Sequence, residues 1–357
     1  MDKRTRRPGI GDVAREAGVS KTAVSFAFNS PERLRTETAT RIRDVAAALG
    51  YRPHPVARML SQRRTGSVGI LTPQALSVLF SNPFFGEFSE GAALAAEESG
   101  YGLHFVSPLR GSLSSAIERA VVDGFVVIGL SADHPEVEQV RQAGLPIVLV
   151  DSTALSGYCS VEVDDEGGAD AAARHVLELG HRTILILGVG SAELRSPIDP
   201  RSVMGRRLAG YRAAIADVGG SAAASLVVGP ATIEGGLIAF EGAWREGQRP
   251  TAVLAMSDAM AIGALQATRN LGLSVPRDLS IVGFDDIDVA RYTDPPLTTV
   301  HQPIRRKGEE AVRLLLSVLD RPGAAPVEHR QLETRLIVRG STGPISQERS
   351  DEAAVRG

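Results

Sequence analysis

The sequence predicts a small all-α domain at residues 1–64, built around a helix-turn-helix, and an α/β domain of two lobes at residues 65–343. In the stretch VAREAGVSKTAVSFAFN, residues 13–29, two short helical patterns are separated only by Gly18, Val19 and Ser20, which is typical of a helix-turn-helix. From Ser67 onward, Val/Ile/Leu runs of strand length alternate with helical patterns, which predicts parallel sheets covered by helices on both faces. These runs are too many for a single doubly wound sheet, so we expect two lobes.

Charge is distributed unevenly between the two domains. Residues 1–64 carry 14 Lys+Arg and 6 Asp+Glu, a net charge of +8, whereas the rest of the chain carries 25 basic and 36 acidic residues, a net charge of −11. A basic domain joined to an acidic one indicates that the first meets a polyanion such as nucleic acid. A basic tail that is merely solvated is the alternative on charge alone.

Composition argues against several classes of protein. The most apolar runs, such as residues 121–130, are interrupted by Asp123 and Gly124 and are shorter than the roughly 18 residues of a membrane span. The first residues, MDKRTRRPGIGDV, contain no apolar core of a signal peptide. The single cysteine, Cys159, excludes an internal disulfide and fits a reducing compartment. We therefore expect a cytoplasmic protein that does not contact membranes.

Apolar residues between positions 10 and 49 recur at helical spacing on three helices. Gly18 supplies the left-handed position that ends the first helix, Ser20 is a good N-cap for the second, and the third is expected from Thr36 to Gly50. The apolar positions expected to be buried are Ile10, Val13, Ala14 and Ala17 on the first helix, Ala23, Val24 and Phe28 on the second, and Ile42, Val45, Ala46 and Leu49 on the third.

The second helix of a helix-turn-helix enters the major groove of DNA with its N-terminal residues towards the base edges. On this placement Lys21, Thr22, Ser25 and Phe26 project outward. A small helical bundle that uses the same turn is the alternative. With two hinge residues included, the candidate DNA-binding residues are Ser20, Lys21, Thr22, Ser25, Phe26, Asn29, Arg58 and Leu60.

Residues 53–64 form a predicted hinge between the domains. Pro53 and Pro55 resist continuation of the third helix, and residues 56–62 can form two turns of a hinge helix, too short to persist alone in water. Arg58 suits contact with a phosphate, and Leu60 suits an apolar wedge between base steps in the minor groove. A proline-rich, basic linker is the alternative.

Several motifs together resemble one family. IGDVAREAGVSKTAVSFAFN is followed by the hinge GYRPHPVARML and then by VDGFVV, LGHRTILILG, RRLAGYRAAI, VPRDLSIVGFDD and PPLTTVHQP. With these motifs the chain resembles the LacI/GalR family of bacterial transcription regulators, to about Gly343. The resemblance implies a helix-turn-helix DNA-binding domain with a hinge helix, and a periplasmic-binding-protein-like (type I) effector domain that also dimerises. It implies one lobe from about 67–162 and 293–323, another from 163–292 and 324–343, and a disordered tail at 344–357.

The sequence departs from the family pattern at two positions of the first domain. Many members have an arginine at the position of Phe26, where it can donate two hydrogen bonds to a guanine edge. Phenylalanine cannot do so, but it can contact a thymine methyl group or read local DNA shape. Burial of the ring against the hinge or a neighbouring domain is the alternative. Gly11 lies where some members place a phosphate-contacting side chain.

Ligands of open α/β sheets bind beyond the carboxyl ends of the strands, and a cleft between two lobes brings two such edges together. Asp151, Asp258 and Asp285 each follow an apolar run of strand length. Because a carboxylate can accept hydrogen bonds from adjacent hydroxyl groups, these residues suit a polyol. Asp285 and Asp286 as caps of the following helix are the alternative.

Arginine and phenylalanine side chains complete the candidate effector site. Arg201 and Arg207 flank the turn before LAGYRAAI and can donate planar pairs of hydrogen bonds. Phe84 and Phe85 can cover the apolar face of a sugar or base, unless they belong to the core. The resemblance implies Asp285 and Arg207 as the most regular effector contacts, with Asp151, Arg201 and Phe85 next.

The predicted function is transcriptional regulation, most simply repression, controlled by a small ligand such as a sugar. A corepressor-dependent regulator that senses a nucleobase is the alternative, and a sugar-binding protein without DNA function is a distant one. The expected partners are a pseudo-palindromic operator, the effector and a second copy of the chain. The terminal STGPISQERSDEAAVRG contains no leucine heptads, so we expect a dimer.

Enzyme and metal functions find no support in the motifs. GVGSAEL, residues 188–194, resembles a G-x-G-x-x-G loop but ends in Leu194. The seven histidines are scattered and the only cysteine stands alone, so we expect no metal site, no cofactor and no catalysis.

Overall fold

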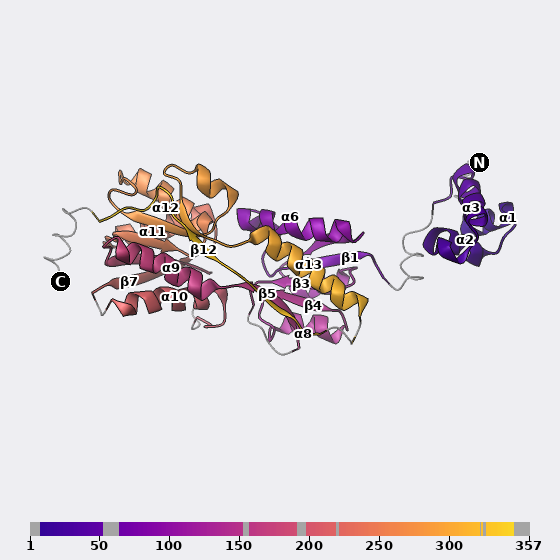
Figure 1. Ribbon diagram of the computed structural model, residues 1–357, viewed down its shortest axis with the longest axis horizontal. Helices are drawn as coiled ribbons and strands as arrows, with labels where there is room; N and C mark the ends of the chain where they lie inside the picture. Colours follow the sequence, from indigo (N-terminus) through magenta and orange to yellow (C-terminus); the bar gives the residue numbers. More distant parts are fainter. Residues whose placement is uncertain are drawn as a thin grey trace. The chain divides into compact units, whose positions relative to one another are not determined.

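The computed structural model describes residues 8–52, 64–152, 157–190, 198–218, 221–321, 323 and 326–345 (Figure 1). It contains two compact units, Met1–Gly66 and Ser67–Gly357, whose boundary lies two residues from the predicted one. The predicted hinge helix at 56–62, with Arg58 and Leu60, lies outside the described residues, as does most of the expected tail.

In its described residues the first unit contains the three predicted helices and one short 3-10 helix. They are α1 (Ile10–Glu16), α2 (Lys21–Asn29), η1 (Pro31–Arg33) and α3 (Thr36–Ala48). Gly18 has a φ of +65° and allows the chain to reverse between α1 and α2. The Ser20 hydroxyl oxygen accepts from the backbone N–H of Ala23 at 3.1 Å and so caps α2. The predicted helix-turn-helix is confirmed.

The core of this unit corrects the predicted burial at several positions. Val13, Val24 and Ile42 are fully buried, as expected. On α2 the second buried residue is Ala27, whereas Ala23 and Phe28 are only partly buried, and the Phe28 ring packs edge-on against Tyr51. Leu49 is 36% exposed because it is the C-cap residue of α3 and follows its last full turn.

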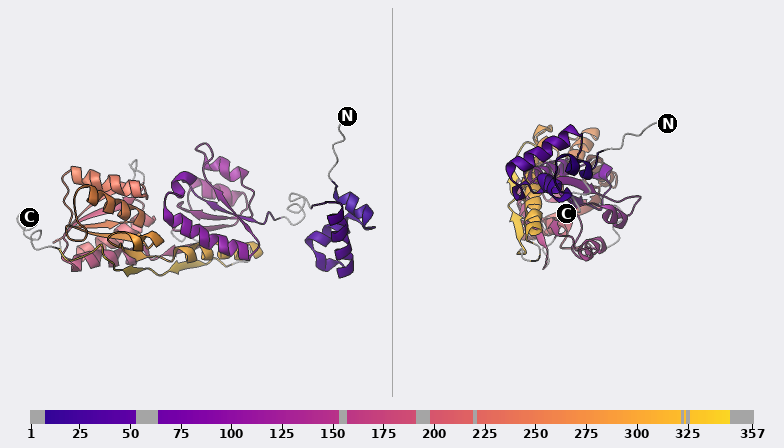
Figure 2. Two further views of the ribbon diagram at one scale, coloured as in Figure 1. Left: turned by 90° about the horizontal axis from the view of Figure 1, so that it is seen from above. Right: turned by 90° about the vertical axis from the view of Figure 1, so that its right-hand side faces the viewer.

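The second unit has two six-stranded sheets, each covered by helices on both faces (Figures 1 and 2). The sheet of lobe one has the order β11-β5-β4-β3-β1-β2 and contains only parallel pairs. Its strands are β1 (Ser67–Leu71), β2 (Gly102–Val106), β3 (Phe125–Ile128), β4 (Ile147–Val150), β5 (Cys159–Val163) and β11 (His329–Leu332). Its helices are α5 (Leu76–Leu79), α6 (Pro83–Glu98), α7 (Leu113–Arg119), α8 (Pro135–Gln142) and α13 (Ile304–Asp320).

The sheet of lobe two has the order β12-β10-β9-β8-β6-β7, and only the β10–β12 pair is antiparallel among its described strands. Its strands are β6 (Thr183–Val189), β7 (Ala223–Gly229), β8 (Ala252–Ala255), β9 (Ser280–Asp285), β10 (Thr298–His301) and β12 (Arg335–Ile337). Its helices are α9 (Asp165–Glu178), α10 (Val203–Asp217), α11 (Ile233–Arg245), α12 (Asp258–Asn270) and the 3-10 helix η2 (Asp288–Tyr292). The buried Val/Ile/Leu strands confirm the predicted α/β class.

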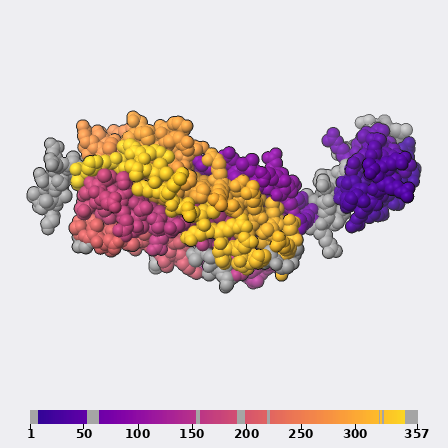
Figure 3. Space-filling view, viewed as in Figure 1, coloured from indigo at the N-terminus to yellow at the C-terminus, as the bar shows by residue number. Residues whose placement is uncertain are grey.

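The chain passes between the lobes after β5, after β10 and after β11. The predicted lobe boundaries at 292/293 and 323/324 are therefore wrong for two strands. β10 belongs to lobe two because it pairs with β9 from Thr298 to His301, and β11 belongs to lobe one because it pairs with β5. Figure 2 shows the β11–β12 segment running beside both lobes, and Figure 3 shows the yellow C-terminal residues continuous across them.

Helices α6 and α13 touch through glycine. A Cβ atom added at Gly91 of α6 would overlap the backbone oxygen of Arg305, and one added at Gly308 of α13 would overlap the backbone oxygen of Phe88. The two helix backbones are therefore in direct contact where they cover the sheet of lobe one.

Within the described part of the chain, no helix combines the length and the apolar character that crossing a membrane requires.

Candidate nucleic-acid interface and ligand pocket

The N-terminal end of α2 is the most open part of the helix-turn-helix. Lys21 and Thr22 are exposed, whereas Ser25, Phe26 and Asn29 are half-buried. The Asn29 amide donates to the Ser25 hydroxyl at 3.2 Å, which fixes both side chains on one face of the helix. The pair joins the middle of α2 to its last residue, whereas the exposed Lys21 and Thr22 lie at the N-terminal end that the sequence assigned to base edges.

The Phe26 side chain is neither fully exposed to solvent nor part of the buried core. Its ring is half-buried on the outer side of α2, and the Arg33 guanidinium carbon lies 5.3 Å from the ring centroid, within range of a cation–π contact. Arg33 is exposed and comes from η1, seven residues along the chain. The sequence did not predict this pair, because nothing in the local pattern indicates that η1 turns back over α2.

Phe26→Ala should change base preference at one or two operator positions and leave non-specific binding nearly intact. The ring offers apolar surface to a base edge but no charge to a phosphate. We expect discrimination at those positions to fall by about 1 kcal/mol, within the usual range for one base pair. Competition between base-substituted duplexes at fixed salt measures it, and a uniform loss across all sequences would instead mark Phe26 as structural.

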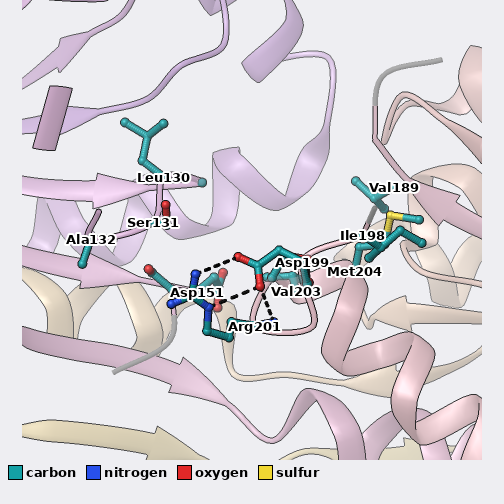
Figure 4. Close-up of a pocket in the computed structure, with 13 residues that line it drawn as sticks. Leu130, Ser131, Ala132, Asp151, Val189, Ile198, Asp199, Arg201, Val203 and Met204 are labelled. Atoms are coloured by element: carbon teal, nitrogen blue, oxygen red, sulfur yellow. Dashed lines mark hydrogen bonds and ion pairs between the residues drawn. The ribbon is translucent and has the colours of Figure 1, made fainter. Parts of the chain in front are cut away.

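A cavity of about 410 Å³ lies at the carboxyl ends of strands from both lobes. Lobe one contributes residues 129–132 after β3, with Asp151 and Ser152 after β4; lobe two contributes Val189 of β6 and residues 198, 199 and 201–204 at the start of α10. Figure 4 shows Leu130, Ser131 and Ala132 on one side and Val189, Ile198 and Met204 on the other. The wall is mostly apolar with a few polar groups, as in small-molecule sites.

The charged groups of this pocket are Asp151, Asp199 and Arg201. Asp151 has a φ of +56°, and its Oδ1 accepts from the Nζ of Lys307 at 2.6 Å. The Arg201 Nε donates to Asp199 at 3.3 Å (Figure 4). Hydrogen bonds from the backbone and side chain of Arg201 lower the pKa of Asp199. These groups can orient a polar ligand within the apolar wall.

Of the seven predicted effector residues, Asp151 and Arg201 line the pocket, and Phe84, Phe85, Arg207, Asp258 and Asp285 are not among its lining residues. Phe84 is 8% exposed and its ring stacks on Phe88 at 6.4 Å. The core alternative is therefore confirmed for Phe84. The Phe85 ring meets Phe84 edge-on and is half-buried.

Arg207 lies buried behind the pocket, on α10. Its Nε donates to Asp165 Oδ1 at 2.8 Å, and another guanidinium nitrogen donates to the Met256 carbonyl. The guanidinium also stacks on the Phe284 ring at 3.5 Å from the centroid. Asp165 in turn accepts from Arg206 at 2.6 Å. The guanidinium group of Arg207 is thus covered on its planar face by the Phe284 ring and hydrogen-bonded along its edge by Asp165 and the Met256 carbonyl.

Asp285 and Asp258 form the buried acidic part of lobe two. Asp285 Oδ1 accepts from the Gln302 amide at 2.5 Å and lies 3.8 Å from Arg207. Asp258 accepts from the Thr299 hydroxyl at 2.5 Å and from the Ile287 backbone N–H at 3.0 Å. Burial, and then the neighbouring Asp285 charge, raise the pKa of Asp258 well above its usual value.

The alternative that Asp285 and Asp286 cap the following helix is wrong. Asp285 accepts from Gln302, and Asp286 contacts His301 at 3.0 Å and Arg339 at 2.5 Å. The following 3-10 helix η2 has no side-chain cap hydrogen bond. Asp285 is thus bound by the residue that follows β10, and Asp286 by β10 and the segment after β12.

The stability of Asp285→Asn relative to wild type should increase as the pH rises from 4 to 7. Burial raises the pKa of Asp285 to about 6, above its usual value near 3.9. Between these values the folded state holds a proton that the unfolded state has lost, so wild-type stability falls as pH rises through this window. The increase should be about 2 kcal/mol from pH 4 to pH 7.

Urea unfolding at several pH values measures this change, with Asp286→Asn as the control of opposite sign. Although burial alone would raise it, hydrogen bonds from His301 and Arg339 hold the pKa of Asp286 below its usual value. Asp286→Asn should therefore lose stability at neutral pH, and the loss should disappear as the pH falls below about 4. Equal pH profiles for Asp285→Asn and wild type would refute the assignment.

Three residues that bind the candidate site residues were not predicted from the sequence: Lys307, Gln302 and Asp165. Lys307 is fully buried and lies on the apolar side of α13, three residues after Ile304 and four before Ala311. A charged residue at a core position of an amphipathic helix is the signal that could have identified it. Gln302 and Asp165 lie next to two of the three places where the chain passes between the lobes. The sequence did not predict the exact residues at which these passages occur.

Among the described residues, no group of three or more His, Cys, Asp or Glu side chains is arranged to hold a metal ion.

Comparison with known proteins gives two family matches. Residues 9–54 match the model for bacterial regulatory proteins of the lacI family, and residues 173–342 match a periplasmic binding protein-like domain. An HTH-type transcriptional regulator of Mycobacterium tuberculosis, Rv3575c, is 35% identical over 361 residues, covering 95% of this chain and 98% of the relative.

Two solved structures extend the similarity to three dimensions. The lac repressor dimer bound to operator and the anti-inducer ONPF is 25% identical with a TM-score of 0.78, covering 95% of this chain and 100% of that one. The complex of the transcriptional regulator CelR with cellobiose is 29% identical with a TM-score of 0.67, covering 94% of this chain and 100% of that one.

Proposed function

This chain belongs to the lacI family of DNA-binding transcriptional regulators, and we propose that it is a repressor whose affinity for operator DNA is controlled by a sugar in the pocket between its lobes. The observation that carries the proposal is the pocket itself, which lies at the carboxyl ends of strands from both lobes. Such a site changes shape when the lobes move. The cellobiose of the CelR complex supports a sugar as the ligand class.

Asp151 and Arg201 are the proposed direct ligand contacts. Both line the cavity, and a carboxylate beside a guanidinium can accept from and donate to the hydroxyl and ring oxygens of a sugar. Arg207, Asp258 and Asp285 are proposed to hold the wall of lobe two from behind. Phe84 belongs to the core, so it is not proposed as an aromatic cover for either a sugar or a nucleobase.

The DNA contacts are proposed to come from α2 and from the hinge. Ser20, Lys21, Thr22, Ser25, Phe26 and Asn29 share the outer side of α2 or its N-terminus, and Arg33 joins them through Phe26. A single helix-turn-helix makes few base contacts, so a symmetric dimer on a roughly palindromic operator is the expected complex. The operator-bound lac repressor dimer supports this arrangement.

Exposed apolar side chains provide surface for the dimer. Phe80 and Leu94 on lobe one and Ile238 and Tyr292 on lobe two are all about half exposed or more, and they are the proposed apolar contacts of the dimer. We place the protein in the cytoplasm, where its operator lies, and assign it no catalysis.

Ligand and operator are coupled through the lobes. A sugar that closes the pocket would rotate one lobe against the other and change the spacing of the two DNA-binding domains in the dimer. By linkage, ligand and operator alter each other's affinity by the same factor. Repression released by the sugar is the proposed direction.

Selection of genomic fragments by the purified full chain tests the function. We expect enrichment of a roughly palindromic fragment over random duplex at moderate ionic strength, and release of that fragment by at least one sugar of a panel. No preference for any fragment, with and without sugars, would contradict the proposal.

A further inference from the structure

Lys307 is a fully buried ammonium group beneath the ligand pocket. Its Nζ donates to Asp151 Oδ1 at 2.6 Å and to Gln302 Oε1 at 2.5 Å, and lies 5.4 Å from the centroid of the Phe84 ring. Its side chain is 0% exposed. A buried charge is tolerated only when it is paired and hydrogen-bonded. The ammonium group of Lys307 can therefore stay buried here only because it is bound to Asp151.

Asp151 therefore faces two environments. It lines the cavity, where a ligand would meet it, and it is bound from below by Lys307. Its left-handed φ of +56° is costly for a residue other than glycine. The ion pair holds the carboxylate in this conformation and cancels its charge.

The other charges of the lining are matched as well. Arg201 and Asp199 bind each other, with Arg201 also 3.4 Å from Asp133 beside the lining. Each positive group of the described lining and its partners thus has a carboxylate bound to it, and the one additional carboxylate, Asp133, is exposed.

We infer that the pocket accepts an uncharged ligand, and that Lys307 is the residue that determines this specificity. The inference rests on the proposed sugar-controlled function. An ionic ligand would lose its hydration in a mostly apolar cavity without gaining an unpaired opposite charge. A neutral polyol keeps its hydrogen bonds, because the oxygens of Asp151 still accept from its hydroxyl groups. Uncharged sugars are therefore selected over sugar phosphates and sugar acids.

Calorimetry of the full chain against matched probes tests the ligand class. The probes are ribose, glucose, galactose, maltose and cellobiose, together with ribose 5-phosphate, glucose 6-phosphate, galactonate and gluconate. We expect the tightest binder to be neutral and to bind about tenfold or more tightly than a charged counterpart. A tighter charged probe would overturn the inference while leaving sugar control of the operator intact. Binding by none of them would contradict the proposed sugar function, and the charge variants below would then decide the role of Lys307.

Charge variants test the role of Lys307 itself. Lys307→Met leaves Asp151 unpaired, so the affinity ratio of glucosamine over glucose should rise about tenfold. Adding Asp151→Asn should return that ratio to the wild-type value. Arg306→Met is the matched control, because it removes a positive charge from the same helix at a position that is 66% exposed, and its ratio should not change.

Stability gives a readout that needs no ligand. Lys307→Met should lower the thermal midpoint, and the double variant with Asp151→Asn should recover most of the loss, because it no longer buries an unpaired carboxylate. If Lys307→Met and the double variant have equal midpoints well below that of wild type, Lys307 does not neutralise Asp151 and the inference fails.

Discussion

Asp165→Ala should lower the free energy of unfolding of the effector domain by about 3–5 kcal/mol, the usual cost of breaking a buried ion pair from one side. Asp165 is 1% exposed and accepts from Arg207 at 2.8 Å and from Arg206 at 2.6 Å. Burial alone would raise its pKa, but the two guanidinium groups outweigh burial and hold the pKa of Asp165 below its usual value. Without the carboxylate, Asp285, at 3.8 Å, is the one opposite charge that the described part of the chain leaves within ion-pair distance of the buried Arg207.

Urea unfolding at pH 7 measures this loss, and Asp170→Ala in the same helix is the control. Asp170 binds Arg174 at 2.6 Å, but Arg174 is 46% exposed, so the pair contributes at most about 1 kcal/mol. Similar losses for the two variants would show that Asp165 is not the anchor of the buried arginine.

Gly91→Ala should destabilise lobe one by about 3 kcal/mol, at the upper end of the cost of overpacking. A methyl group at this position would overlap the backbone oxygen of Arg305. A backbone atom cannot move aside by changing rotamer, so α6 and α13 would have to separate. The helical preference of alanine over glycine, about 0.5–1 kcal/mol, is too small to compensate.

Gly86→Ala provides the matched comparison within α6. A Cβ atom at Gly86 would meet nothing within 4 Å, so this variant should gain about 0.5–1 kcal/mol. The two substitutions are chemically identical and should shift the thermal midpoint in opposite directions. A shift of the same sign for both would mean that the contact between the helices is looser than the structure shows.

The helix-turn-helix could be predicted from sequence because its determinants are local. Gly18, the Ser20 cap and the apolar spacing around Val24 lie within a few residues of the elements that they define. Sheet membership was harder to predict, because β10 and β11 read alike as short strands. The partners that place them, β9 and β5, are decided by pairing between distant segments.

The part of the candidate ligand site that the sequence predicted is the part that follows from one rule, namely that ligands bind at the carboxyl ends of parallel strands. Asp151 directly follows a central parallel strand, and such ends meet at one edge of a sheet. The rule could not tell whether a polar side chain at that edge is already satisfied by the protein. Asp165 engages Arg207, and Gln302 engages Asp285, and both partners come from distant segments of the chain. Lys307 looked like an ordinary basic residue of a helix.

The glycine contact between α6 and α13 also bears on how the lobes move. Ordinary helix pairs slide by small adjustments of interlocked side chains. At Gly91 and Gly308 no side chains separate the two helix backbones, so α6 and α13 cannot slide in this way. α13 begins at Ile304, and only Gln302 and Pro303 separate it from the last residue of β10, so a movement between the lobes cannot be absorbed within α13 and α6. We therefore expect lobe one to move as one rigid body, with the change in backbone angles confined to the three links that follow β5, β10 and β11.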